Sequence, residues 1–160
     1  METQTSSPWR YRPAVASDAE ACVVLRGKTR ENAVSRERLA RAGITVESWG
    51  DDIAAGRLPG HVCTLDGELI GYCFGDRPTG EVVVLALLPS FENLGIGKHL
   101  LSLVVADLHS FGHVRLFLGC SRDPSSRSYG FYRHRGWRST GAVDGNDDEV
   151  LELIGPRRSS

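Results

Sequence analysis

The sequence predicts one α/β (α+β) domain, with a central, mostly antiparallel mixed sheet of six to seven strands flanked by helices on both faces. The run from Val82 to Leu88 is apolar at both alternating positions, which is typical of a strand covered on both sides. Strand-like and helix-like patterns mix along the whole chain, and Asp66-Gly67 stands between two strand patterns as a hairpin turn. With 160 residues, 41% of them hydrophobic, the chain is long enough for one domain with a sizeable core.

The N-terminal third predicts one strand and three short helices. Residues 9–15 alternate well enough for a strand. Ser17-Asp18-Ala19-Glu20 has the spacing of a capping box, which predicts a helix that ends near Arg30. A second helical piece spans about 35–43, and a third, capped by Thr45, continues to Gly56.

A hairpin and the central strand follow. Residues 61–65 and 68–74 form the hairpin about its two-residue turn, and 76–80 turn the chain into the central strand. Pro89 ends that strand because it has no N–H for the sheet.

Next comes a glycine turn at the start of a helix. Beyond Gly95-Ile96-Gly97, apolar residues recur at helical spacing as far as Phe111. The unpaired N–H groups at such a helix start, with the positive end of the helix dipole, favour a phosphate group. The sequence therefore predicts an anion-binding site at this turn.

The C-terminal part predicts two more strands and a helix. Residues 114–118 form a strand, and Asp123-Pro124 is a suitable N-cap and first position for a helix that reaches about Arg135. A polar turn at 144–148 then precedes a last strand at 150–154.

Composition and charge limit the partners. The net charge of −1 gives no electrostatic case for nucleic acid or for an anionic membrane. No run approaches transmembrane length, and METQTSSPWR lacks the apolar core of a signal peptide. We therefore expect a cytoplasmic protein, with a flexible lead at 1–8, a single domain at 9–156 and a tail at 157–160.

The cysteines fit the same expectation. They show neither a C-x-x-C pair nor a metal-ligand spacing, so no metal is predicted. A two-residue turn at Asp66-Gly67 would place Cys63 and Cys73 on opposite faces of the hairpin, where they cannot form a disulfide. Free thiols are expected of Cys22, Cys63, Cys73 and Cys120.

Two common phosphate-binding loops do not fit the glycine turn. A Walker loop requires Gly-x-x-x-x-Gly-Lys-Ser/Thr, and Gly97-Lys98 matches its end, but Glu92 replaces the first glycine and His99 the hydroxyl residue. The dinucleotide fingerprint Gly-x-Gly-x-x-Gly fails at its last glycine, which is Leu100 here.

A third pattern does fit. Residues 92–97 (ENLGIG) resemble the Gln/Arg-x-x-Gly-x-Gly/Ala motif of the GNAT superfamily, the N-acetyltransferases that use acetyl-coenzyme A. Leu87-Leu88-Pro89 resembles the strand end and proline before that motif, and 131–137 (FYRHRGW) resemble the family's late tyrosine and Gly-aromatic segment. The resemblance covers about 60–140. It departs at Glu92, where Gln or Arg is usual, and we expect this carboxylate to point away from a bound diphosphate.

The resemblance implies a GNAT-like fold and the transfer of an acetyl group from acetyl-coenzyme A to a primary amine, by direct attack in a ternary complex. Backbone amides would hold the diphosphate, and main-chain groups beside the strand end would hold the pantetheine arm, with the Leu87 N–H facing the acetyl oxygen. Ser125 stands where relatives often have asparagine, and Lys98 or a later arginine would meet the ribose phosphate. The implied cofactor-binding residues are Leu87, Leu88, Pro89, Asn93, Leu94, Gly95, Ile96, Gly97, Lys98, Ser125 and Tyr132.

Glu81 and Tyr132 are the candidate catalytic residues. An amine with a pKa of about 10 must lose a proton before it attacks, and Glu81, the single charge on an apolar strand, occupies the position of the glutamate base in histone-acetylating relatives. Tyr132 resembles the tyrosine that protonates the departing thiolate. The alternative interpretations are an exposed carboxylate and a packing aromatic. In ribosomal-protein-acetylating relatives the base lies elsewhere, at the position of Cys120 here.

The acceptor and the assembly are left open. In the superfamily the region between the first two helices, here about 26–46, lines the acceptor side, and its basic residues favour either an acceptor with a carboxylate or a plain surface. Residues 115–138 contain six arginines and a single acidic residue, Asp123. This excess of positive charge indicates either a solvated face or a basic rim for a nucleotide cofactor. The chain is expected to be a monomer or homodimer. The alternatives are a non-catalytic acyl-coenzyme A sensor and a transferase of longer acyl groups.

Overall fold

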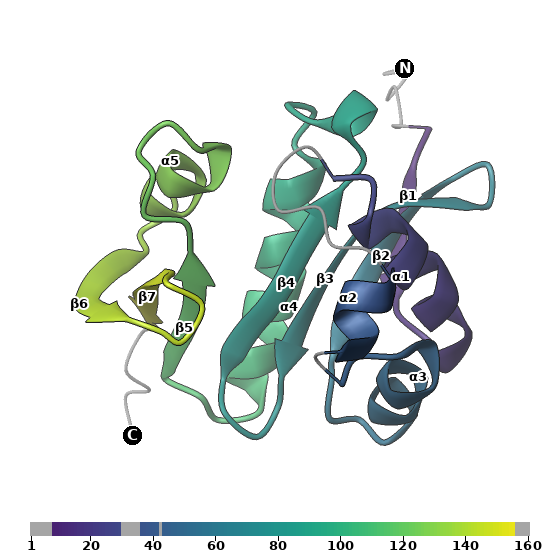
Figure 1. Ribbon diagram of the computed structural model, residues 1–160, viewed down its shortest axis with the longest axis horizontal. Helices are drawn as coiled ribbons and strands as arrows, with labels where there is room; N and C mark the ends of the chain where they lie inside the picture. The colour runs from purple at the N-terminus through teal and green to yellow at the C-terminus, as the bar shows by residue number, and fades with distance from the viewer. Residues whose placement is uncertain (1–7, 30–35, 42, 156–160) are drawn as a thin grey trace, which may run out of the picture.

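A seven-stranded sheet runs through the middle of the molecule in the order β1-β2-β3-β4-β5-β7-β6 (Figure 1). The computed structural model describes residues 8–29, 36–41 and 43–155. Neighbouring strands are antiparallel except for β4 and β5, which are parallel. The predicted fold class, a mostly antiparallel mixed sheet with helices, is therefore confirmed.

The strands in sheet order are β1 (Arg10–Pro13), β2 (Gly60–Leu65), β3 (Glu68–Asp76), β4 (Glu81–Leu87), β5 (Arg115–Cys120), β7 (Glu149–Ile154) and β6 (Arg138–Val143). The helices are α1 (Ala19–Arg26), α2 (Arg36–Arg41), α3 (Val46–Ala54), α4 (Ile96–Ser110) and α5 (Arg127–Arg133), with two short 3₁₀ turns, η1 (Ala16–Asp18) and η2 (Pro89–Phe91).

Helices cover both faces of the sheet, and each face has its own hydrophobic core. The long helix α4 packs behind β2, β3 and β4, and α1 and α3 lie in front of them (Figure 1). Leu100, Val104 and Leu108 of α4 are fully buried behind the sheet. In front, Tyr72 and Phe74 of β3 pack against the α1 and α3 side chains. This double covering explains why β4 is apolar on both faces.

The first helix begins later than its capping box predicts. In the predicted box Ser17 is the cap and Glu20 the third residue of the helix, but in the structure Asp18 is the N-cap of α1. The Asp18 carboxylate accepts the Val15 N–H at 2.8 Å and pairs with Arg12 at 2.7 Å. A 3₁₀ turn forms there instead, and α1 begins at Ala19. A partner on β1, which lies outside the four residues of the helix signal, therefore affects where the helix starts. The predicted end near Arg30 lies outside the described residues.

Two further differences concern the C-terminal half. The predicted helix start at Asp123 is wrong, because the Asp123 carboxylate accepts the N–H and hydroxyl of Ser125, at 2.9 and 2.8 Å, in a local turn that delays α5 to Arg127. Strand β6 was not predicted, since its sequence RSTGAV has no alternating apolar pattern and every residue is exposed. It forms at the sheet edge through pairing with β7.

The hairpin also corrects the cysteine faces. A register shift between Cys63 and Thr64 pairs Cys63 with Gly71 and His61 with Cys73, so both cysteines face the same core. A bulge of one residue reverses the faces of the residues beyond it. All four cysteines are buried free thiols.

The predicted domain limits stay a prediction, and the lead and tail, apart from Pro8, lie outside the described residues. Among the described helices, none combines the length and hydropathy that a bilayer crossing requires.

Candidate functional site

The site begins where the sheet fails to close. β4 pairs with β5 at one position only, Glu81 opposite Phe117, and the two strands diverge beyond it (Figure 1). On its other edge β4 pairs with β3, and there the register passes from Phe74–Val84 to Gly75–Val82. Val83 therefore has no partner in β3 and is a bulge, which bends a strand. The bend directly after Glu81 and Val82 carries β4 away from β5.

The divergence leaves two main-chain amides of β4 facing the opening. The Leu88 N–H donates to the Ile70 carbonyl of β3 at 3.0 Å. Because hydrogen-bonded pairs alternate along antiparallel strands, the N–H groups of Leu87 and Leu85 face the other way. Leu88 is already bonded through both groups, since its carbonyl accepts the Phe91 N–H at 2.9 Å. The Leu87 N–H thus faces the opening, on the side where it was predicted to meet the acetyl group. The Leu85 N–H is a second amide on this side, which was not predicted from the sequence.

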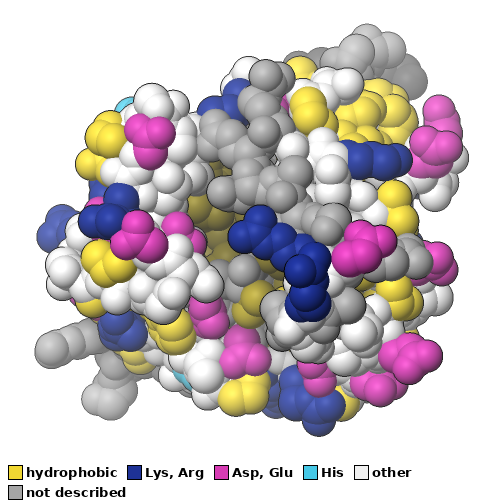
Figure 2. All heavy atoms as spheres, viewed as in Figure 1, with side chains coloured by type: hydrophobic (Ala, Val, Ile, Leu, Met, Phe, Trp, Pro, Cys, Tyr) yellow, Lys and Arg dark blue, Asp and Glu magenta, His cyan; other side chains and the backbone are white. Residues whose placement is uncertain are grey.

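The space-filling view shows the surface hollowed between the half formed by β1–β4 and the half formed by β5–β7 and α5, with hydrophobic side chains on its floor (Figure 2). Lys and Arg side chains lie beside the hollow (Figure 2). On the predicted acceptor side, Lys28, Arg38 and Arg41 are exposed, whereas Arg30 and Glu31 lie outside the described residues.

The predicted glycine turn lies at the upper end of β4 in Figure 1. Gly95 is the N-cap of α4 with a φ of 83°, and Asn93 also has a positive φ of 65°, which glycine adopts freely and asparagine tolerates. None of the amides from Asn93 to Lys98 donates a hydrogen bond to a described residue. A Cβ at Gly95 would meet no atom within 4 Å. The turn therefore offers a row of donors that no described residue uses, beside open space at Gly95.

The side chains of this turn contribute less than its backbone. Ile96 is fully buried and anchors α4 in the core, whereas Leu94 is 50% exposed. Gly97 lies under α5, because a Cβ there would be 3.7 Å from the Phe131 ring. Lys98 is exposed, and Pro89 opens the short turn η2.

Glu92 is directed to α5. Its carboxylate pairs with the Arg127 guanidinium at 2.9 Å, and the same guanidinium donates to the Asn93 side-chain oxygen at 2.9 Å. The sequence reading placed Glu92 away from the amides but gave it no partner.

Glu81 lies at the point where β4 and β5 separate. It is half-buried, and burial raises the pKa of its carboxyl, with the negative charges of Asp76 and Asp144 raising it further. A raised pKa makes a carboxylate a stronger base at neutral pH.

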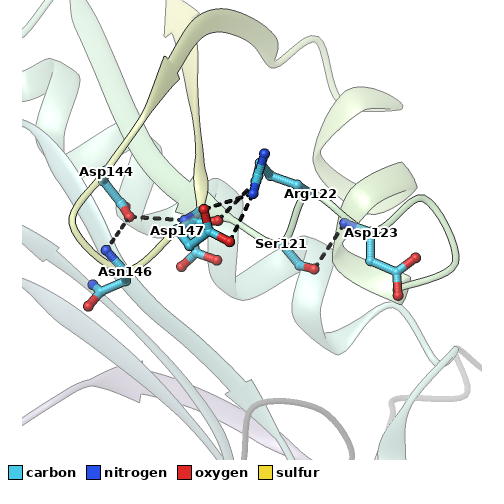
Figure 3. Close-up of polar contacts among 7 residues, drawn as sticks. Ser121, Arg122, Asp123, Asp144, Asn146 and Asp147 are labelled. Atoms are coloured by element: carbon cyan, nitrogen blue, oxygen red, sulfur yellow. Dashed lines mark hydrogen bonds and ion pairs between the residues drawn. The ribbon is translucent and has the colours of Figure 1, made fainter.

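Asp144 is a neighbour of Glu81, although the sequence pattern predicted for it only a place in a polar turn. Figure 3 shows this turn beside the loop after β5, where the Arg122 guanidinium donates to both Asp147 carboxylate oxygens at 2.7 and 2.8 Å. Asp144 accepts the N–H of Asn146 at 2.8 Å within the turn. These contacts fold the turn at 144–148 back toward β5. Asp144, which is far from Glu81 in the sequence, therefore raises the pKa of the Glu81 carboxyl.

Tyr132 is a buried residue of α5. Its ring meets Trp137 and Phe131 edge-on, with centroids 6.0 and 5.0 Å away. Burial raises the pKa of its hydroxyl, and the thiols Cys73 and Cys120 raise it further, so the hydroxyl stays protonated. Ser125, at the position of the family asparagine, is exposed and its hydroxyl donates to Asp123 at 2.8 Å.

Two other surface hollows, of about 430 and 290 Å³, lie around the β3–β4 turn and the end of α4, with Arg77 and Phe111 in both linings. Neither lining contains Glu81 or the amides from Asn93 to Lys98. The candidate site is therefore the opening between β4 and β5, where these groups lie, and its chemistry rather than its volume distinguishes it. No group of three or more His, Cys, Asp and Glu side chains in the described ranges is arranged to hold a metal ion.

The sequence pattern of the acetyltransferase (GNAT) family matches residues 29–137, more than half of the chain. The chain belongs to this family. It is an acyltransferase by that membership, and the GNAT resemblance of its glycine turn is confirmed. No curated protein matches the chain by sequence.

Solved structures agree with the GNAT assignment. The PaiA N-acetyltransferase from Thermoplasma acidophilum, in complex with coenzyme A, superposes with a TM-score of 0.78 at 21% identity, over 92% of this chain and 99% of its own. The ribosomal-protein-S18-alanine N-acetyltransferase from Escherichia coli gives 0.68 at 14% identity, over 93% and 96%. YncA from Salmonella typhimurium, solved with its cofactor acetyl-CoA, gives 0.70 at 15% identity, over 96% and 98%. At these identities the likeness shows the fold.

Proposed function

We propose that this GNAT protein transfers an acetyl group from acetyl-coenzyme A to a primary amine, by direct attack in a ternary complex. The observation that carries the proposal is the open edge of β4. It has unused amides at one end, from Asn93 to Lys98, and a carboxylate of raised pKa, Glu81, at the other.

The glycine turn fits the diphosphate of the coenzyme. Unpaired amides at a helix N-terminus bind phosphate oxygens, and Gly95 leaves space for them because no atom lies within 4 Å of its Cβ position. Asn93, Leu94, Gly95, Ile96, Gly97 and Lys98 would hold this group through their main chain.

The length of β4 supports an arm that lies along it. The strand has seven residues, so at about 3.3 Å per residue its ends are roughly 20 Å apart. A coenzyme held at the glycine turn would reach Glu81 along this edge, where the Leu87 amide would hold the arm. Leu85 is two residues nearer to Glu81 and is the better placed amide for the acetyl oxygen, a role that the sequence reading gave to Leu87.

Glu81 would act as the base and Tyr132 as the acid. Bound acetyl-coenzyme A supplies the acetyl group as a thioester, whose carbonyl carbon bonds to the amine nitrogen as the carbon–sulfur bond breaks. Glu81 takes the proton that the amine loses, directly or through water, and the Leu85 N–H stabilises negative charge on the carbonyl oxygen. Tyr132, kept protonated by its burial, donates its proton to the thiolate.

Two alternatives are kept, and one experiment separates them. A sensor would bind the coenzyme without turnover, and a transferase of longer acyl groups would prefer those thioesters. Release of thiol is measured with acetyl-, propionyl- and butyryl-coenzyme A against a panel of amines, amino acids and peptides. Turnover of acetyl-coenzyme A on an amine supports the proposal, and tight binding without turnover on any acceptor overturns it.

The acceptor amine stays open, and the panel is chosen to define it. Acceptors with and without a carboxylate test whether the exposed basic residues Lys28, Arg38 and Arg41 select for one. A monomeric or homodimeric state and a cytoplasmic location stay predictions.

A further inference from the structure

The glycine turn carries a carboxylate that is unfavourable in a diphosphate site. Glu92 opens the motif where the family usually has Gln or Arg, and it directly precedes the unused amides from Asn93 onward. Its side chain is only 12% exposed, so water screens its charge incompletely. A carboxylate and a diphosphate repel each other, and the repulsion is stronger at a partly buried site than in bulk water.

Arg127 meets this carboxylate from another element. Its guanidinium lies 2.9 Å from the Glu92 carboxylate and donates to the Asn93 side-chain oxygen at 2.9 Å. Asn93 has a positive φ of 65°, so the arginine contacts the part of the turn with the least common backbone conformation. One side chain therefore holds two consecutive residues of the turn.

A second contact fixes the same face of α5 over the turn. Phe131 follows Arg127 by four residues and so lies on the same side of the helix. Its ring is 3.7 Å from the Cβ position of Gly97. Arg127 is thus held beside Glu92 by the packing of its helix, in addition to the attraction of the charges.

We propose that Arg127 is a positioning residue that neutralises Glu92 and keeps its carboxylate away from the amides, so that a turn containing an acid accepts the diphosphate of coenzyme A. This inference rests on the proposed function and concerns the same site. Arg127 of α5 thus compensates the negative charge of Glu92, a charge that a Gln or Arg at position 92 would not introduce.

The test is a double-mutant cycle with coenzyme A binding as its readout, measured by titration calorimetry on the full chain. R127M removes the guanidinium from the Glu92 carboxylate, and we expect the Kd for coenzyme A to rise about tenfold, the factor that loss of one ordinary charge-assisted contact produces. The rise becomes smaller at high salt, since salt screens the repulsion. E92Q, which restores the usual family residue, changes the Kd by about twofold or less.

The decisive variant is the double mutant E92Q/R127M. Without the carboxylate there is nothing to neutralise, so its Kd is expected to return to that of E92Q. An equal loss from R127M in both backgrounds overturns the proposal, because Arg127 would then contact the phosphates itself. Pantetheine, which has the arm but no diphosphate, is the second probe, and an equal loss of pantetheine binding in R127M also overturns it.

Arg115 supplies the matched control. Its guanidinium pairs with Glu152 at 2.6 Å and is 49% exposed, against 45% for Arg127, but it lies on β5 away from the turn. R115M is expected to leave the coenzyme Kd unchanged. A wild-type protein that does not bind coenzyme A would overturn the proposed function itself, whereas wild-type binding that R127M leaves intact would overturn only the role of Arg127.

Discussion

The two edges of β4 differ completely, although they belong to one strand of seven residues. Toward β3 the pairing extends from Glu81 to Leu87 with one bulge at Val83, and Leu88 adds a further hydrogen bond. Toward β5 there is one paired position. The closed edge belongs to the core, and the open edge carries the unused amides and Glu81. The chemistry is thus expected where the sheet stops pairing.

Two buried tyrosines extend this comparison to the side chains. Tyr72 of β3 lies on the closed side, fully buried among Trp49 and Phe74. Its hydroxyl finds no hydrogen-bond partner in the part of the chain that the structure describes. Tyr132 of α5 belongs to the other core cluster, and the thiols Cys73 of β3 and Cys120 of β5 affect its hydroxyl. Burial raises the pKa of both hydroxyls, so their positions, and not their acidities, separate their roles.

The largest expected effect follows from Tyr132→Phe. Loss of the proton donor should lower kcat about a hundredfold, the usual scale for one acid–base group, while the Kd for coenzyme A stays nearly unchanged. Steady-state kinetics and calorimetry measure the two quantities. A collapse of coenzyme binding would show that the tyrosine is structural.

Tyr72→Phe is the matched change on the closed side. It should leave kcat unchanged and raise the free energy of unfolding by about 1 kcal/mol, since it removes a buried hydroxyl to which the described residues offer no partner. Urea titration measures this stability. A loss of activity here would remove the distinction between the two edges.

Glu81→Gln tests the proposed base, which lies where β4 and β5 separate. The wild-type rate should rise with pH through the raised pKa of this carboxyl, and the variant, without a base, should become active only as the amine itself deprotonates at higher pH. We expect a loss of at least about tenfold near neutral pH. Asp144→Asn should shift the wild-type rise toward lower pH, because it removes a negative charge that raises the Glu81 pKa. Identical profiles for wild type and Glu81→Gln would exclude Glu81 as the base.

Gly95→Ala tests the amide end of the same edge. A methyl group at a φ of 83° costs about 1–2 kcal/mol, and relief of that strain turns the amides, so the Kd for coenzyme A should rise about tenfold. Gly112→Ala is the control, since Gly112 follows the other end of α4 with a φ of 102° and no atom within 4 Å of its Cβ position. Both variants should lose similar stability, and only Gly95→Ala should lose coenzyme. Equal coenzyme affinities in the two variants would count against the glycine turn as the diphosphate site.

The smallest expected effect is on the pH dependence of stability. Because the folded-state pKa of Glu81 is raised, the folded protein binds more protons than the unfolded chain between the ordinary carboxyl pKa and the raised value. Glu81 therefore destabilises the fold as pH rises through that window and fully above it. Glu81→Gln should gain stability relative to wild type between pH 4 and pH 7, as urea titrations at the two pH values would measure. A difference that does not vary with pH would contradict the raised pKa.

Local sequence patterns predicted a large part of the fold and the place of the site. The apolar run at 82–88, the proline after it and Gly95-Ile96-Gly97 were sufficient for a covered strand, a turn and a helix start, because each depends on neighbours a few residues away. The same residues carried the GNAT resemblance. Edge strand β6 was not predicted, because its own sequence has no strand pattern. It is a strand because it pairs with β7.

The details of the site depend on contacts between distant segments. The bulge at Val83 is a mismatch between two strands and has no signature in either strand alone. The pairs Arg127–Glu92 and Arg12–Asp18, and the effect of Asp144 on Glu81, join residues that only the folded chain brings together.

The sequence by itself therefore determined the family, the central strand and the amide-rich turn, since short-range periodicity and glycine placement specify these. Only the tertiary structure decided which edge of β4 is open, which amides face it and which charges surround Glu81 and Glu92. Register and ion pairing are long-range properties, and one bulged residue reverses the direction of every group beyond it.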